Sequence, residues 1–229
     1  MKNILNEKPS KKLSGRLRKT FSFVDVKDIT NKTIINVGCG YGWFELHAFK
    51  KKPKKIVGIE ISENDLVTIR ENIKNTNFST KVGSAIDLPF KDRSADTIVS
   101  WEVIEHIPKN TEHKFFEEVH RVLKKNGVFY LSTPYRSFLS TTLDPAFWLI
   151  GHRHYSKKDF IKYAEANNFI IEKCDVTAGN WTVVSQLNTY ISKWIFRRSP
   201  FFQDFFLRKE DAEYLKKGTH NIFVKFRKV

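Results

Sequence analysis

Two carboxylates and an imidazole stand close together in the sequence, at Glu102, Glu105 and His106. If this stretch turns as a helix, spacings of three and four residues place the three side chains on one face. Carboxylate oxygens with one imidazole nitrogen suit Mg²⁺, Mn²⁺ or Fe²⁺ and leave coordination positions open for a substrate. The same residues also suit a site without metal, in which His106 acts as a general base or positions a substrate. Both interpretations stay open on spacing alone.

A glycine-rich turn lies earlier in the chain, between an apolar β-branched run at 33–37 and a plausible helix at 43–49. Strand, glycine turn and helix form the nucleoside- or phosphate-binding start of a Rossmann-like unit. Glu60 ends the next apolar run, 20 residues after Gly40, where such folds place a carboxylate on ribose hydroxyls. The alternatives are a tight turn without a ligand and a solvated strand end. The glycines of the turn are Gly38, Gly40 and Gly42.

Apolar runs and helical patterns alternate along the first two thirds of the chain. A helix is expected to begin at Ser62, because Asp65 three residues later gives a pattern like a capping box. The alternation predicts an α/β fold, a Rossmann-like doubly wound sheet whose strands are mostly parallel. Ligands bind such sheets at the carboxyl ends of the strands, which is where the segment 102–108 follows the fourth strand. The first five strands are predicted at 33–37, 55–60, 78–82, 95–101 and 128–132.

The bulky Trp43 stands where dinucleotide-binding folds have Gly or Ala, so it argues against a pyrophosphate on this helix. Together, the motifs between residues 33 and 175 resemble those of class I S-adenosylmethionine-dependent methyltransferases. The resemblance implies a seven-stranded sheet whose last strand, 221–226, is antiparallel and lies beside the fifth. It also implies that S-adenosylmethionine is the cofactor and contacts residues of the turn and strand ends: Asn36, Gly38, Gly40, Gly42, Glu60, Ser84, Ala85 and Trp101.

Two of these positions depart from the family pattern. The family usually has Asp or Glu where this chain has Asn36, which brings no charge to the ammonium group of the cofactor. Ser84 replaces the usual acid in the loop 83–90 that surrounds the adenine, and a hydroxyl accepts a weaker hydrogen bond than a carboxylate does. The departures leave open a non-catalytic cofactor-binding scaffold, although the retained Glu102, Glu105 and His106 argue against it.

The Glu-x-x-Glu-His pattern resembles that of ubiquinone-biosynthesis O-methyltransferases and small-RNA 2′-O-methyltransferases. In those families the motif and a later histidine hold a divalent cation that chelates substrate hydroxyls. The resemblance implies catalytic roles for Glu105, His106 and His152, with Mg²⁺ or Mn²⁺ as the ion. His154 competes with His152 for the role of the later histidine. The implied metal ligands are Glu102, Glu105, His106 and His152.

The composition is strongly basic, with a formal charge of +15 and a pI near 9.7. Such a charge favours nucleic acid, an anionic membrane surface or an anionic substrate, and a lysine-rich proteome would explain it equally well. Cys39 and Cys174 form no metal or disulfide pattern, so a reducing cytoplasm is expected. Neither a signal peptide nor a transmembrane helix is predicted. We divide the chain into a basic N-terminal arm, 1–20, and a methyltransferase domain, 21–229.

Within this domain we expect a cofactor half, 33–134, and substrate or lid insertions at 135–160 and 181–216. The aromatic and arginine-rich part, 181–206, is a lid over an apolar pocket, a surface for an anionic membrane, or an ordinary helix pair. The predicted function is O-methylation of a small or lipid-linked hydroxyl compound, in the cytoplasm or peripherally at the inner face of a membrane. The alternative among enzymes is a 2′-O-methyltransferase that acts on an RNA end. We rank nucleic acid lower as a partner, because the aromatic residues cluster away from the basic arm.

Overall fold

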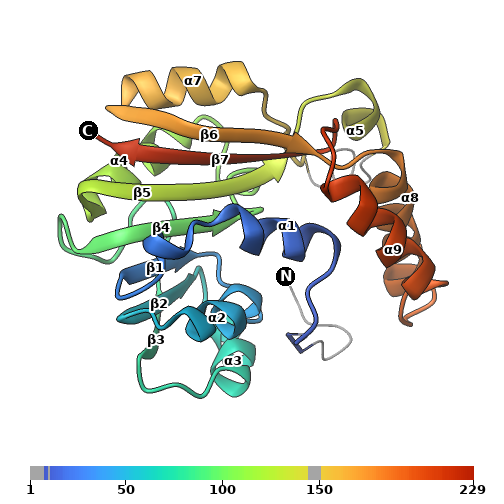
Figure 1. Ribbon diagram of the computed structural model, residues 1–229, viewed down its shortest axis with the longest axis horizontal. Coiled ribbons are helices and arrows are strands. Elements are labelled where there is room, and N and C mark those ends of the chain that lie inside the picture. Colours follow the sequence, from blue (N-terminus) through green and yellow to red (C-terminus); the bar gives the residue numbers. More distant parts are fainter. Residues whose placement is uncertain (1–7, 10, 144–150) are drawn as a thin grey trace.

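The computed structural model describes residues 8, 9, 11–143 and 151–229. Seven strands form one sheet in the order β3-β2-β1-β4-β5-β7-β6 (Figure 1). β7 is antiparallel to both β5 and β6, whereas the pairs among β1 to β5 are parallel. The predicted Rossmann-like α/β sheet, with an antiparallel last strand beside the fifth, is therefore confirmed. The strands are β1 Thr33–Val37, β2 Lys55–Glu60, β3 Phe78–Val82, β4 Ala95–Trp101, β5 Leu123–Pro134, β6 Phe169–Thr177 and β7 Asn221–Lys228.

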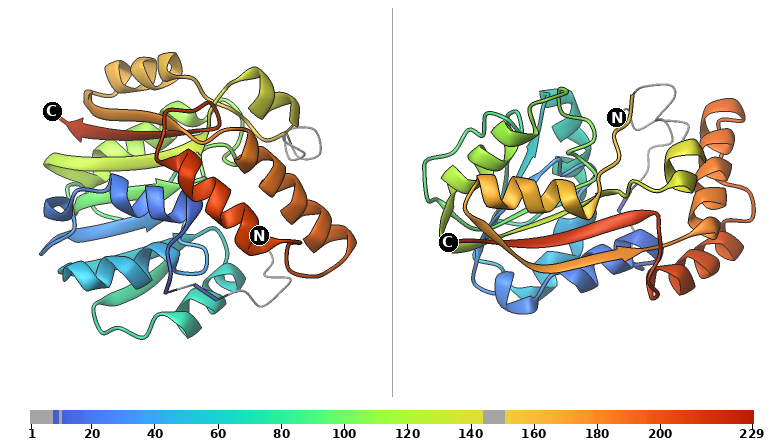
Figure 2. Two further views of the ribbon diagram at one scale, coloured as in Figure 1. Left: turned by 45° about the vertical axis from the view of Figure 1, so that its right-hand side comes forward. Right: turned by 90° about the horizontal axis from the view of Figure 1, so that it is seen from above.

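Helices cover both faces of the sheet (Figure 2). α4 and α7 pack on one face, α1 and α2 pack on the other, and α3 packs beside α2. The helices are α1 Gly15–Phe23, α2 Trp43–Ala48, α3 Glu63–Asn72, α4 Glu112–Val122, α5 Phe138–Leu143, α7 Lys157–Ala166, α8 Asn180–Tyr190 and α9 Gln203–Tyr214. Shorter turns are η1 Val26–Asp28, η2 Phe49–Lys51 and η3 Ile191–Ile195.

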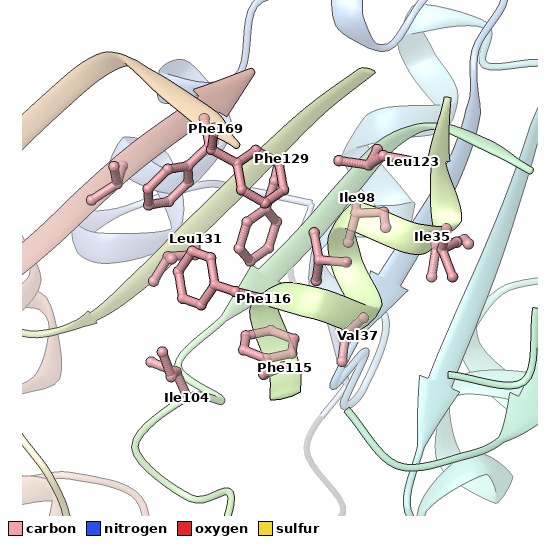
Figure 3. Packing of buried hydrophobic residues seen from close by; sticks show 14 of the residues in the cluster. Ile35, Val37, Ile98, Ile104, Phe115, Phe116, Leu123, Phe129, Leu131 and Phe169 are labelled. Atoms are coloured by element: carbon pink, nitrogen blue, oxygen red, sulfur yellow. The ribbon is translucent and has the colours of Figure 1, made fainter. Parts of the chain in front are cut away.

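The larger core lies between the sheet and the α4–α7 layer (Figure 3). Phe115 and Phe116 of α4 lie with their ring centroids 5.6 and 5.8 Å from that of Phe129 in β5. Ile35 in β1 is the register partner of both Val57 and Ile98, so β1 lies in the interior of the sheet. Such strands are buried on both faces, which explains their continuous apolar sequence.

Helix α3 begins as the sequence predicts, because the Ser62 hydroxyl oxygen accepts the backbone N–H of Asp65 at 3.3 Å. The expected N-terminal arm, 1–20, extends too far. Residues from Gly15 onward form α1, and α1 packs against α9 (Figure 1). The N–H of Gly15 donates to Asp211, and Arg18 pairs with the same carboxylate at 3.2 Å. These contacts join residues nearly 200 positions apart, so local sequence gives no sign of them.

α8, η3 and α9 stand together at the edge of the sheet where β5 ends (Figure 1). Glu213 of α9 accepts the backbone N–H groups of Gly179, Trp181 and Thr182 at 2.9 to 3.1 Å and so caps the start of α8. This segment occupies the predicted insertion 181–216. The other predicted insertion, 135–160, contains α5, and its residues 144–150 lie outside those described. Among the described residues, no helix is long and apolar enough to cross a membrane.

Lys225 of β7 ties the N-terminal segment to the sheet. Its side chain is only 3% exposed, and the ammonium nitrogen lies 2.7 to 2.9 Å from the carboxylates of Asp25, Asp28 and Glu172. Tyr130 of β5 donates a hydrogen bond to Asp28 at 2.6 Å. Although burial opposes the charge on Lys225, hydrogen bonds to these carboxylates raise its pKa above the ordinary value. One buried cation therefore holds three anions that would otherwise repel one another.

We predict that Lys225→Met lowers the free energy of unfolding by about 3 kcal/mol, because it leaves Asp28 buried without a cation. This figure is at the low end for a broken buried ion pair, since Asp25 and Glu172 are partly exposed. The exposed Lys158→Met is the control and should change stability by less than about 0.5 kcal/mol. Urea unfolding measures both variants. Equal stabilities would show that the cluster contributes nothing to the fold.

Candidate active site

The glycine turn between β1 and α2 has positive φ at Gly38, Gly40 and Gly42, with values of +74°, +53° and +89°. A Cβ atom at Gly38 would lie 2.3 Å from Val103, and one at Gly42 would lie 2.7 Å from Ile73. Those two glycines are required by protein packing. A Cβ at Gly40 would meet no atom within 4 Å. The space beside Gly40 is therefore open to a ligand, as the sequence predicts.

Glu60 at the end of β2 reaches this turn. Its Oε1 accepts the backbone N–H of Gly40 at 2.6 Å, which places the carboxylate beside the open space. Burial raises the pKa of Glu60, and the hydrogen bond from Gly40 acts in the opposite direction. The second oxygen of the carboxylate is not used in this bond. Contact of Glu60 with ribose hydroxyls stays a prediction.

The loop after β3 forms a small turn that Ser84 closes. The hydroxyl oxygen of Ser84 accepts the N–H of Ile86 at 3.3 Å, and Ala85 packs against the main core. A hydroxyl oxygen has two lone pairs and a proton, so Ser84 keeps hydrogen-bonding capacity for a ligand. Trp101, at the end of β4, lies with its ring centroid 6.1 Å from that of Phe44 in α2. Its buried Nε1–H has no hydrogen-bond partner among the described residues.

The segment after β4 is not helical, so the condition for placing its three side chains on one helical face is not met. Residues 102–107 form turns, and Glu102 has a φ of +56°. Its carboxylate accepts the Ser132 hydroxyl at 2.6 Å and pairs with Arg16 of α1 at 2.9 Å. The expectation that Glu102 shares a helical face with Glu105 and His106 is therefore wrong. Contacts with α1 and β5 determine where Glu102 points.

Glu105, His106 and His152 come together at this edge, with potential ligand atoms that all lie within 4.8 Å of one another. The centroids of the two imidazole rings are 4.7 Å apart, and His152 Nε2 lies 3.7 Å from Glu105 Oε1. Thr133 of β5 donates a hydrogen bond to the other oxygen of Glu105 at 2.9 Å. His154 lies outside the group, 6.0 Å from His152 by ring centroid, with its Nδ1 facing Thr141. Of the two candidate histidines, His152 is the one that joins the cluster.

Burial is the main cause of the electrostatic changes in this cluster. It raises the pKa of the Glu105 carboxyl, and the nearby Glu102 acts in the same direction. Partial burial and the neighbouring His152 lower the pKa of His106 to about 4. The His106 imidazole is therefore neutral near pH 7, with a nitrogen lone pair available for a proton or a metal ion.

A cavity of about 630 Å³ adjoins this cluster at His152. Its wall combines aromatic rings, including Tyr155 and Tyr163, with paired ions. Arg153 lies 3.1 Å from Glu112, and Arg136 lies 3.3 Å from Asp159. Such a wall suits a small molecule that has both a ring and polar groups.

At this edge the structure also contains three polar residues that the sequence analysis did not select, Glu45, Thr133 and Arg16. The buried amide of Asn36 donates to Glu45 of α2 at 2.7 Å, and Thr133 holds Glu105. One feature of the sequence could have pointed to Glu45: it is a charged residue inside the otherwise apolar start of a helix. No such feature points to Arg16, because its partner Glu102 is 86 residues away.

Comparisons with known proteins agree with this architecture. Residues 35–131 match the family model described as a methyltransferase domain. A proposed S-adenosylmethionine-dependent methyltransferase of Mycolicibacterium smegmatis is 26% identical over 62% of this chain and 53% of its own. The ubiquinone biosynthesis O-methyltransferase of Pelagibacter ubique is 24% identical over 74% of this chain and 77% of its own. The chain thus spans about half to three quarters of these two relatives.

A solved structure of an S-adenosylmethionine-dependent methyltransferase from Mesorhizobium loti superposes with a TM-score of 0.63 and 16% identity, covering 93% of this chain and 95% of that one. Taken with the sequence matches, this shared fold places the protein in a known class. Residues 35–131 match the methyltransferase-domain family, and the fold is the one found in class I S-adenosylmethionine-dependent methyltransferases.

We predict that Gly40→Val reduces binding of S-adenosylhomocysteine by more than about a hundredfold, because a branched side chain would fill the ligand space. Gly151→Val is the matched control, since Gly151 also has positive φ and no atom within 4 Å of an added Cβ. Calorimetry should give near wild-type affinity for the control and no binding of NAD to any form. Wild-type affinity in Gly40→Val, or tight NAD binding, would contradict the assigned ligand space.

Proposed function

We propose that this protein transfers a methyl group from S-adenosylmethionine to a hydroxyl of a small or lipid-linked acceptor. The observation that carries the proposal is the meeting of Glu105, His106 and His152 at the edge of the sheet that also holds the glycine turn. The similarity to a ubiquinone biosynthesis O-methyltransferase supports the same class of acceptor. The adjoining cavity at His152 has the size and mixed wall that a small acceptor needs.

In this mechanism the acceptor oxygen attacks the sulfonium methyl carbon in line. The new O–C bond forms as the S–C bond breaks, and S-adenosylhomocysteine leaves with the sulfur electron pair. Holding both partners in this geometry supplies on the order of 7–11 kcal/mol. In a site without metal, the acceptor hydroxyl loses its proton to a neutral imidazole of the cluster. His106 is placed for this step, because it lies on the exposed side of the group formed with the buried Glu105 and His152.

The same cluster fits a divalent cation. One carboxylate and two imidazoles form a donor set suited to Mn²⁺ or Fe²⁺ better than to Mg²⁺, which prefers oxygen ligands, and positions are left for acceptor oxygens. The buried Oε1 of Glu105 has no hydrogen-bond partner among the described residues. We therefore propose Glu105, His106 and His152 as ligands, without Glu102, whose carboxylate pairs with Arg16. A bound cation would lower the pKa of a coordinated hydroxyl and orient it.

We predict that Mn²⁺ binds the wild-type protein and that Glu105→Gln weakens this binding by about tenfold or more, because a ligand charge is lost. Calorimetry with MnCl₂ alone measures the binding, and exposed Glu117→Gln is the control. Affinity for S-adenosylhomocysteine should stay near the wild-type value in both variants. Absence of Mn²⁺ binding would refute the cation and leave the imidazoles as the base.

We further propose that α8, η3 and α9 contact an anionic membrane. Large apolar side chains point outward there, and Ile195 and Phe202 are 70% and 80% exposed. The acids of this segment mostly face inward, since Asp211 pairs with α1 and Glu213 caps α8. Exposed aromatic rings among bases are typical of a surface that lies at a lipid interface. The exposed bases are Arg197, Arg198, Arg208, Lys209, Lys216 and Lys217.

We predict that the protein sediments with phosphatidylglycerol vesicles at low salt and is released as salt rises, because the Debye length falls to about 10 Å at 0.1 M. Replacing both Ile195 and Phe202 by Ser should reduce the bound fraction several-fold. Replacing the exposed Ile161 and Ile170 by Ser is the control and should change nothing. Equal retention of the two double variants, or no retention of the wild type, would overturn the membrane contact.

A further inference from the structure

A buried polar pair lies beneath the glycine turn. Asn36 stands in β1 two residues before Gly38, and Glu45 is the third residue of α2, on the other side of the turn. The two side chains are 1% and 0% exposed, and Asn36 Nδ2 donates to Glu45 Oε1 at 2.7 Å. No step of the proposed methyl transfer uses either residue.

Each partner keeps one polar atom without a hydrogen bond. Neither Asn36 Oδ1 nor Glu45 Oε2 has a partner among the described residues, although both atoms are buried. Because the amide nitrogen of Asn36 is held by a carboxylate, the free atom of that side chain is an acceptor. Two unsatisfied buried acceptors side by side are costly unless a donor joins them.

In the part of the chain that the structure describes, no cationic side chain is paired with Glu45 to balance a buried carboxylate. Burial raises the pKa of Glu45 to about 7, and the nearby charged side chain that affects it is another acid, Glu60. None of the turn residues 38–42 is charged, so the turn itself supplies no side-chain charge to a ligand in the space beside Gly40. Glu60, whose carboxylate lies beside that space, is the acid expected on the ribose hydroxyls. An anion for a second, cationic part of the ligand must come from β1 or α2, where Asn36 and Glu45 stand.

We infer that Glu45, acting through Asn36, provides the negative charge that holds the ammonium group of the methyl donor. Glu45 orients the amide of Asn36 so that Oδ1 accepts the ammonium N–H, and its own carboxylate neutralises the charge. Glu45 of α2 thus takes the place of the carboxylate that the family usually has at position 36. Glu45 is a positioning residue in this arrangement. The inference rests on the proposed binding of S-adenosylmethionine.

Calorimetry with two ligands tests the inference. S-adenosylhomocysteine carries the ammonium group, whereas 5′-methylthioadenosine lacks the whole amino-acid part. Glu45→Gln should weaken binding of S-adenosylhomocysteine by about tenfold to a hundredfold and leave methylthioadenosine within about twofold. An equal loss for both ligands would mean a merely structural role, and no loss for either would mean no role in binding. Both results overturn the inference.

A charge exchange provides the matched control. In the double variant Asn36→Asp/Glu45→Gln the carboxylate and the amide change places, and affinity for S-adenosylhomocysteine should return to within about threefold of the wild type. A folded double variant that stays as weak as Glu45→Gln would contradict a role of the charge. Thermal unfolding of each variant shows whether it is folded.

Wild-type protein gives a measurement that does not depend on any variant. The analogue of S-adenosylhomocysteine without its amino group should bind at least about tenfold more weakly than the parent compound. Equal affinities would overturn the ammonium site while the cofactor assignment stands. A wild-type protein that binds neither S-adenosylhomocysteine nor methylthioadenosine would instead refute the proposed function, and with it this inference.

Discussion

No side chain can be accommodated at Gly38 or Gly42, and this steric constraint sets the geometry of the ligand edge. The turn needs positive φ at three alternate positions, and Val103 and Ile73 occupy the space where two of the Cβ atoms would be. Because β1 is held between β2 and β4, the turn emerges between the ends of those strands. Glu60 and the 102–107 segment can therefore reach the same space only while the turn keeps this shape.

Charge at this edge differs from the charge of the whole molecule. The chain is strongly basic, yet burial raises the pKa of three carboxyl groups around the ligand space, Glu45, Glu60 and Glu105. Buried carboxylates lack hydration, and an approaching cation lowers their energy most where water is excluded. A methyl donor that carries both a sulfonium and an ammonium group is such a ligand. The basic residues, by contrast, are mostly on the outer surface, where they can meet an anionic partner.

The fold and the glycine turn were predictable because local sequence determines them. β-branched runs, alternate glycines and the Ser62 cap act over a few residues, and each has the structure that its pattern indicates. The geometry of Glu102 was not predictable, since Arg16 and Asn221, which lie 86 and 119 residues away, hold its carboxylate. The same reason hides the packing of helix α1. The pairing of Asn36 with Glu45 spans only nine residues, but it depends on how α2 folds back over β1 after the turn. Neither Arg16 nor Glu45 belongs to a sequence motif, so their roles can be recognised only from their tertiary contacts.

Helix α1 physically couples the two parts of the molecule to which we assign function. At its start Arg16 pairs with Glu102 beside the ligand edge, while Gly15 and Arg18 bind Asp211 of α9. Any shift of α9 must therefore move or break a contact that reaches Glu102. A bilayer pressing on the exposed face of α8, η3 and α9 would act on the same helix. Since α1 carries both sets of contacts, the surface proposed for the membrane and the ligand edge are joined through a single packing arrangement.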